Sequence, residues 1–181
     1  SQKRYGAAAL VWATVYLGAG LMQRERVTNI GYNIAEGRGH SPSRLFVKPS
    51  FGNILVWKVI YEADGHFFVD AVRVGTEGSV INGESVRILN LARDFPRLNR
   101  KSQQAKDVRR FERLTNGYLA ADPVMSARII DIRYSMIPNK IDPLWSIEIQ
   151  EEQDASIKLH SHRHNSTEKL LLLWSLITGS S

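Results

Sequence analysis

The stretch Ile54–Gly75, "ILVWKVIYEADGHFFVDAVRVG", decides the class of fold. Side chains along a β-strand point alternately to opposite faces, so Trp57, Val59 and Tyr61 share one face of a first strand. The dipeptide Asp64-Gly65 is a favoured two-residue turn between antiparallel strands. The stretch therefore predicts a β-hairpin.

The rest of the chain continues this mixture of strands and helices. We expect turn-rich loop over residues 75–85, strands within 85–92, 117–122, 126–136 and 143–150, a helix over 102–117 and a last helix over 166–179. The short connections favour antiparallel pairing. The sequence predicts an α+β fold with a mostly antiparallel sheet and packed helices, preceded by a long N-terminal helix. We expect residues 1–40 to form that helix and residues 41–181 a soluble domain.

The segment Tyr5–Met22 contains 18 residues without a charge. This is close to the length needed to cross a hydrocarbon core of about 30 Å. Trp12 and Tyr16 are of the type found at membrane borders, and small residues would allow close helix contact in a membrane or an oligomer. A buried helix of a soluble core is the alternative. On the first interpretation, Tyr5–Met22 is the end of a transmembrane helix that contacts the membrane and another copy of the chain.

The helical pattern continues after this segment and becomes amphipathic. Val27, Ile30 and Ile34 repeat at helical spacing, and Gly37 and Gly39 follow where helices commonly end. Basic residues are frequent after the uncharged segment: Arg24, Arg26, Arg38, Arg44 and Lys48. Because basic residues that flank a membrane helix favour the cytoplasmic side, we expect the following domain to lie there. The chain starts at Ser1, and we expect it to be a fragment of a longer protein.

The composition limits the chemistry. The chain has no cysteine, which excludes disulfides, thiolate catalysis and zinc–thiolate sites. Its net charge of +6 would suit an acidic partner such as nucleic acid or an anionic lipid surface. The helix over residues 102–117 has a basic face, but no nucleic-acid-binding motif accompanies it. We therefore expect that face to be solvated and the chain not to bind nucleic acid.

Two charged residues interrupt the apolar stretch Ala127–Pro138. If this stretch is a strand, Asp131 and Arg133 lie side by side on one face. Such a pair is either a structural ion pair or part of a site in which Arg133 binds an anion.

The histidine-rich stretch His160–His164 is a second candidate. In an extended chain, His160, His162 and His164 share one face and could bind zinc or nickel. Solvent-exposed histidines in a polar loop are the alternative.

These patterns resemble, over Arg24–Gln150, the C-terminal part of the bacterial membrane-bound metal-dependent hydrolases. The residues that carry the resemblance are Asn53 with Trp57 in "NILVW", the segment "TNGYLA" at 115–120, and Asp131, Arg133 and Tyr134 in "DIRY". The resemblance implies an inner-membrane protein whose divalent-metal ligands lie in a membrane-embedded half upstream. It implies a soluble C-terminal domain that is accessory to that site, carries no cofactor and is not active alone.

A binding module is the alternative function. On this hypothesis Trp57, Tyr134 and Trp145 line a pocket for a small molecule or a lipid headgroup, and Arg133 holds its anionic group. The candidate binding residues of the chain are thus Asn53, Trp57, Asp131, Arg133, Tyr134 and Trp145, and no catalytic residue is predicted.

Overall fold

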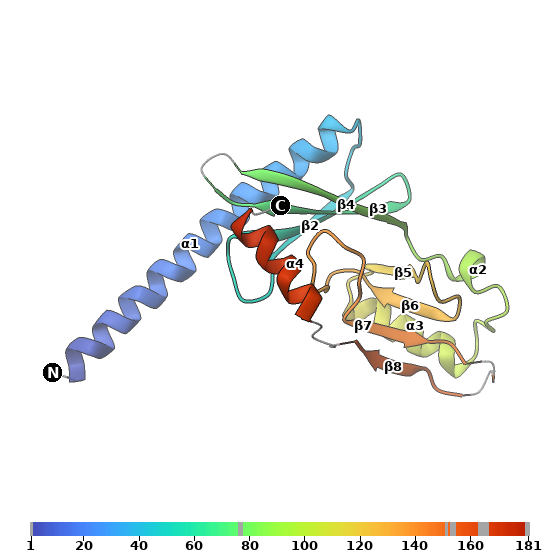
Figure 1. Cartoon of the computed structure of the whole chain (residues 1–181). Helices are drawn as coiled ribbons and strands as arrows, with labels where there is room; N and C mark the ends of the chain where they lie inside the picture. Colours follow the sequence, from blue (N-terminus) through green and yellow to red (C-terminus); the bar gives the residue numbers. More distant parts are fainter. Residues whose placement is uncertain (1, 76–77, 151, 153–154, 163–166, 180–181) are drawn as a thin grey trace.

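A computed structural model describes residues 2–75, 78–150, 152, 155–162 and 167–179. A long N-terminal helix precedes two four-stranded antiparallel sheets and further helices, which confirms the predicted α+β class (Figure 1). The first sheet has the order β1-β2-β3-β4 and the second β5-β6-β7-β8. The helices are α1 (Gln2–Gly37), α2 (Leu91–Asp94), α3 (Gln103–Leu114) and α4 (Thr167–Thr178). The strands are β1 (Arg44–Pro49), β2 (Val56–Ala63), β3 (His66–Arg73), β4 (Ser79–Arg87), β5 (Leu119–Ala121), β6 (Arg128–Asp131), β7 (Trp145–Glu148) and β8 (Lys158–Ser161).

The predicted hairpin forms the centre of the first sheet. Strands β2 and β3 pair in the register Ala63↔His66, which leaves Asp64 and Gly65 as the turn. Both turn residues have positive φ, at 50° and 72°. A type I′ turn requires this conformation, and Asp-Gly adopts it at low cost.

Helix α1 covers one face of the first sheet with its second half. Val27 is fully buried there, and Ile30 and Ile34 pack in the same apolar cluster as Val59 and Val72 of the sheet. The helix ends as its glycines predict. Gly39 has a φ of 75°, and its N–H donates to the carbonyl of Glu36, while the His40 N–H donates to that of Ala35. These are the two hydrogen bonds of a Schellman motif.

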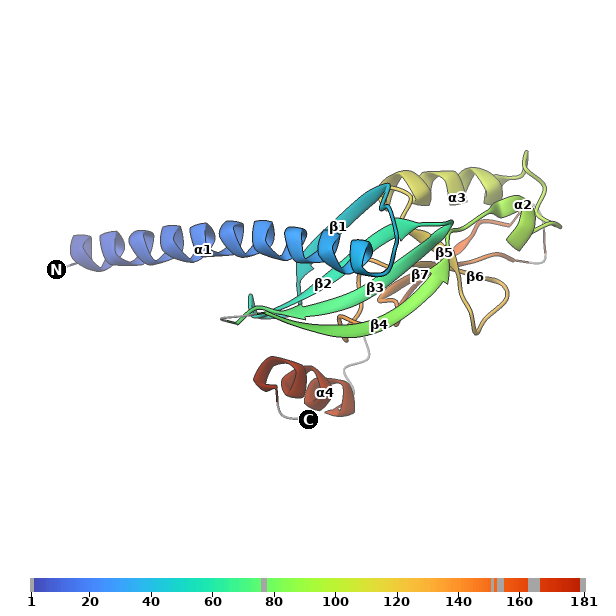
Figure 2. The ribbon, with the colours of Figure 1, turned by 90° about the horizontal axis from the view of Figure 1, so that it is seen from above.

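The first half of α1 projects away from both sheets (Figures 1 and 2). Its large apolar side chains are exposed, among them Leu10, Trp12, Leu17 and Met22. Within the described part of the chain, this is the helix long and apolar enough to cross a membrane, by length and composition. A signal sequence meets the same criterion.

A buried polar network attaches the end of α1 to the sheet. Arg38 donates from both terminal nitrogens to the Asp70 carboxylate, at 2.7 and 3.0 Å, and also to the Tyr61 hydroxyl at 3.1 Å. Asp70 accepts in addition from the backbone N–H of Gly83 in β4, at 2.9 Å. Only 2% of the Asp70 side chain is exposed. The network therefore connects α1 with β2, β3 and β4.

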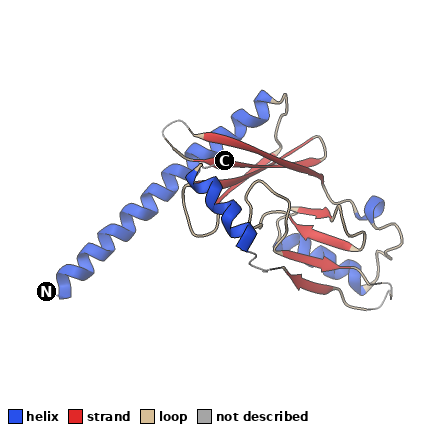
Figure 3. Cartoon of the chain, viewed as in Figure 1, coloured by secondary structure: helices blue, strands red, loops and turns tan. Residues whose placement is uncertain are grey.

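The second sheet packs between the first sheet and α3. On one side Ile130 and Ile132 contact Ile60, Phe67 and Val69 of the first sheet. On the other side Ile129 and Ile147 contact Val108 of α3. Ser102, the first residue of the predicted helix segment, caps the start of α3 by accepting from the Ala105 N–H. Figure 3 shows these layers of strands and helices.

Three strand predictions were wrong. Of the strand expected within 85–92, only residues 85–87 are strand, as the end of β4, and Leu91 and Ala92 begin α2. Residues 79–85 were expected in a loop but belong to β4, an edge strand whose side chains alternate between partly buried and exposed. Its small polar residues hide the strand signal, and Gly83 is needed because a Cβ there would collide with the carbonyls of Val69 and Asn139. Conversely, the strand expected over 126–136 covers only Arg128–Asp131. The chain then turns, because the Asp131 side chain accepts from the Arg133 N–H.

Helix α4 forms as predicted, but most of it is exposed. Leu173 is its buried residue, whereas Leu170, Leu171, Leu172 and Trp174 are exposed. A salt bridge of 2.6 Å joins Lys169 near its start to Asp142.

Candidate functional site

Asp131, Arg133 and Tyr134 meet two lysines of the first sheet and form what we call the Tyr134 cluster: Lys48, Lys58, Asp131, Arg133, Tyr134 and Ser135. Arg133 and Asp131 make a two-pronged ion pair, Nε to Oδ1 at 3.0 Å and Nη2 to Oδ2 at 2.8 Å. Little of either side chain is exposed. The ion pair, one of the two alternatives that the sequence left open, is present, although a turn rather than strand alternation brings its members together.

Tyr134 has two cations close to its ring. Its ring centroid is 4.7 Å from the Lys48 ammonium and 5.1 Å from the Arg133 guanidinium carbon. Cations at this distance from an aromatic face are attracted by the ring quadrupole. Tyr134 therefore moderates the repulsion between two neighbouring positive groups.

Lys48 is only partly buried, unlike Lys58. Burial lowers its pKa, and within the described residues it has no hydrogen bond or ion pair, only its contact with Tyr134. Lys48 lies directly opposite Lys58 in the β1–β2 register. Because the Arg133 charge is balanced by Asp131, Lys48 is the better candidate for contact with an anion.

Lys58 is fully buried and holds a loop in place. Its ammonium donates to the Ser135 hydroxyl at 3.0 Å, to the Pro138 carbonyl at 3.2 Å and to the Lys140 carbonyl at 3.0 Å. Burial lowers the pKa of Lys58 from 10.5 to about 7, and the nearby charge of Lys48 contributes to the shift. All three donors are used within the protein, so Lys58 has a structural role.

The other predicted binding residues lie apart. Asn53 organises the turn before β2: its side chain accepts from the Leu55 and Val56 N–H groups and donates to Ser50. Trp57 is buried on the α1 face of the first sheet and donates to the Ile54 carbonyl. Tyr134 is on the opposite face, beside Lys48, and Trp145 begins β7 in the second sheet. The structure does not bring the three aromatic residues together.

The histidines lie on the edge strand β8 and just after it. His160 is 2.9 Å from a Glu148 carboxylate oxygen, and His162 is 2.7 Å from the buried Ser146 hydroxyl. Both line a groove of about 410 Å³ with Arg128 and Met125. His164 lies outside the described residues. In the described part of the chain, no group of three or more His, Asp or Glu side chains is placed to hold a metal ion. The predicted site of three histidines therefore stays a prediction.

Sequence reasoning missed the importance of Lys48 and Lys58. Both interrupt otherwise apolar strands, which is a local signal for a buried or functional charge. That they lie opposite each other follows only from the β1–β2 register. No family model, curated protein or solved structure matches this chain.

Removal of either member of the Asp131–Arg133 pair should destabilise the protein. We expect Asp131→Ala and Arg133→Ala each to cost about 3–5 kcal/mol, because each leaves a buried charge without its partner. The double variant Asp131→Leu with Arg133→Met should recover part of this loss. Thermal melts in mild detergent measure the effect, and Lys140→Ala, which breaks an exposed pair, should change stability by less than about 1 kcal/mol. Wild-type melting of all three variants would contradict a structural role.

Lys58 should make the protein more stable at higher pH. Between its folded pKa of about 7 and its ordinary value of 10.5, the unfolded chain holds a proton that the folded chain has released. The free energy of unfolding therefore rises with pH in this window, by up to about 1.4 kcal/mol per pH unit. We expect Lys58→Met to remove this rise and Lys106→Met, at an exposed site on α3, to retain it. Melts at pH 7, 8 and 9 compare the slopes; an unchanged slope in Lys58→Met would refute the assignment.

Proposed function

We propose that this chain is the membrane-anchored C-terminal domain of a bacterial inner-membrane metal-dependent hydrolase. Its role is accessory to a membrane-embedded metal site upstream, and the folded domain lies on the cytoplasmic side. The observation that carries the proposal is α1, one continuous helix whose first half is exposed and apolar and whose second half packs on the first sheet.

The dimensions of α1 support a membrane anchor. The 18 uncharged residues Tyr5–Met22 make about 27 Å of helix, close to the thickness of a hydrocarbon core. Leaving so many large apolar side chains in water is unfavourable, at about 1.5–3 kcal/mol for each one. Arg24 and Arg26 follow at once, where basic residues favour the cytoplasmic side.

The residues of the resemblance support an accessory role. Asn53 shapes a turn and Asp131 binds Arg133, so these residues serve the structure of the domain. On this proposal the domain is attached rigidly to the last helix of the membrane-embedded half, because the Arg38–Asp70 network fixes the end of α1 to the first sheet. It would then lie over the cytoplasmic mouth of the metal site.

Arginines introduced into the apolar half of α1 should release the chain from membranes. We expect the wild-type chain to sediment with bacterial membranes and resist alkaline carbonate, and Leu10→Arg with Leu17→Arg to become extractable. Each arginine near the centre of a membrane helix costs roughly 2.5–3.5 kcal/mol of insertion free energy. The matched control is Leu114→Arg, at an equally exposed leucine of α3, which should stay with the membranes.

The intact mass of the extracted protein separates an anchor from a signal sequence. An anchor retains Tyr5–Met22, whereas a signal sequence is removed. A wild-type chain found in the soluble fraction would overturn the anchor.

Metal content tests the accessory role. After loading with Zn²⁺ or Mn²⁺ and gel filtration, residues 1–181 should retain far less than one metal ion per chain. A longer natural chain that includes the preceding apolar helices should retain metal stoichiometrically. Stoichiometric metal in residues 1–181, lost in His160→Ala with His162→Ala, would instead place a metal site in this domain.

A further inference from the structure

After its polar first turn, helix α4 carries apolar side chains on nearly every side, although much of it is exposed. Leu173 faces the protein, whereas Leu171 and Trp174 are 64% and 62% exposed. A helix at a water-facing surface normally presents a polar stripe outward. The 12 residues of α4 make only about 18 Å of helix, which is too short to cross a membrane.

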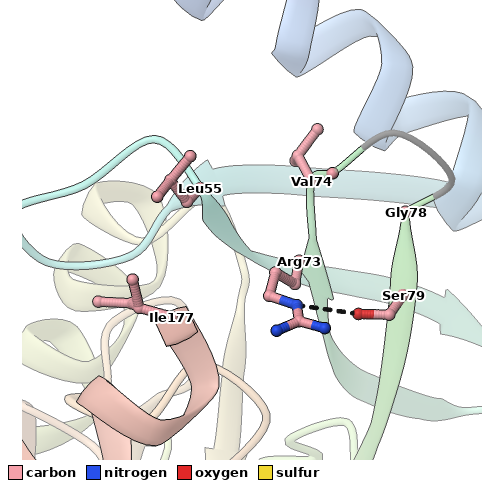
Figure 4. A pocket seen from close by; sticks show the side chains of 7 residues that line it. Leu55, Arg73, Val74, Gly78, Ser79 and Ile177 are labelled. Atoms are coloured by element: carbon pink, nitrogen blue, oxygen red, sulfur yellow. Dashed lines mark hydrogen bonds between the residues drawn. The ribbon is translucent and has the colours of Figure 1, made fainter. Parts of the chain in front are cut away.

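Helix α4 lies close to the part of the first sheet that packs against α1 just after its apolar half. Its residue Ile177 lines a pocket of about 440 Å³ together with Leu55, Arg73 and Val74 (Figure 4). Val74 packs in one cluster with Val27 of α1. Val27 is five residues after Met22, or about 7.5 Å along the helix. Helix α4 thus approaches the first sheet near the level at which the apolar half of α1 ends.

The direction of α4 matches a surface helix. Figure 1 shows α4 running crosswise to α1, and Figure 2 shows the two helices on opposite sides of the first sheet. If α1 crosses a bilayer, a crosswise helix at this level lies along the plane of the bilayer surface. The loop before β2 adds Phe51, which is 72% exposed, and Leu55.

The pocket also supplies a positive charge. Figure 4 shows the Arg73 guanidinium beside Ser79, to which its Nε donates at 3.3 Å. Among the described residues Arg73 has no carboxylate partner. An arginine at the edge of an apolar surface is suited to the phosphate of a lipid headgroup.

We propose that α4 is an interfacial helix that lies in the surface of an anionic bilayer. The lipid-facing surface comprises Phe51, Leu55, Leu170, Leu171 and Trp174, and Arg73 contacts lipid phosphate. The position of Trp174 agrees with the preference of tryptophan for the membrane boundary. This inference rests on the proposed membrane attachment of α1 and adds a second contact, which fixes the tilt of the domain on the membrane.

Because the chain has no cysteine, a spin label can be attached at a single introduced cysteine without further changes. The full chain is reconstituted in vesicles of phosphatidylethanolamine and phosphatidylglycerol with one label at Leu171→Cys, Val124→Cys or Val15→Cys. Val124 is the matched control, an apolar side chain 86% exposed on the β5–β6 connection. Collision rates with oxygen, which concentrates in lipid, and with a water-soluble nickel chelate then report the surroundings of each label.

We expect the oxygen-to-nickel ratio at residue 171 to exceed that at residue 124 several-fold. A ratio at 171 equal to that at 124 would overturn the inference, and so would low collision rates with both reagents, which indicate burial against a second copy of the chain. The label at residue 15 reports the proposed function separately: lipid exposure at 15 with water exposure at 171 refutes the interfacial helix alone.

Arg73→Gln tests the headgroup contact. In the same vesicles we expect this substitution to raise the nickel collision rate at residue 171, because α4 moves outward. Lys106→Gln, which removes a positive charge on α3, should leave the rate unchanged. Equal rates in the Arg73→Gln variant and the parent would exclude the phosphate contact.

Discussion

The carboxylate of Asp70 is the connection on which the arrangement of this protein depends. It is almost completely buried, and it accepts two bonds from Arg38 at the end of α1 and one from the backbone of β4. Apolar packing alone allows a helix to slide or rotate on a sheet, because the hydrophobic effect has no direction. A two-pronged arginine–carboxylate pair has a defined geometry. The direction in which the apolar half of α1 leaves the domain is therefore set by this pair.

The opposite face of the first sheet uses a buried charge in a similar way. Lys58 donates to a hydroxyl and two carbonyls of the segment that follows Tyr134, and so holds that segment against the sheet. A buried ammonium without such acceptors would be very costly. The first sheet thus carries a buried carboxylate toward α1 and a buried lysine toward the second sheet. Both polar contacts orient segments that apolar residues alone would leave less defined.

Three elements of the chain expose large apolar side chains. The first half of α1, the loop before β2 and the outer side of α4 all present large apolar side chains. Soluble surfaces rarely gather so many of them. On the proposed function α1 contacts lipid, and on the further inference the loop before β2 and α4 do so as well, so that the second sheet with α3 lies farther from the membrane. The Tyr134 cluster, with the half-buried Lys48, adds positive charge to the same domain.

Local signals in the sequence determined the hairpin at Asp64-Gly65, the cap of α3 at Ser102 and the end of α1 at Gly39, because each depends on residues within one turn of chain. The apolar character of Tyr5–Met22 is likewise a property of the sequence alone. Tertiary structure decided that residues 79–85, most of them small or polar, form an edge strand, since their pairing comes from the backbone of β3. It also decided the partners of the charged residues. Arg38 reaches Asp70 across 32 positions, and Lys58 reaches Ser135 across 77. Contacts at such separations depend on how the sheets and helices pack, and no local pattern encodes them.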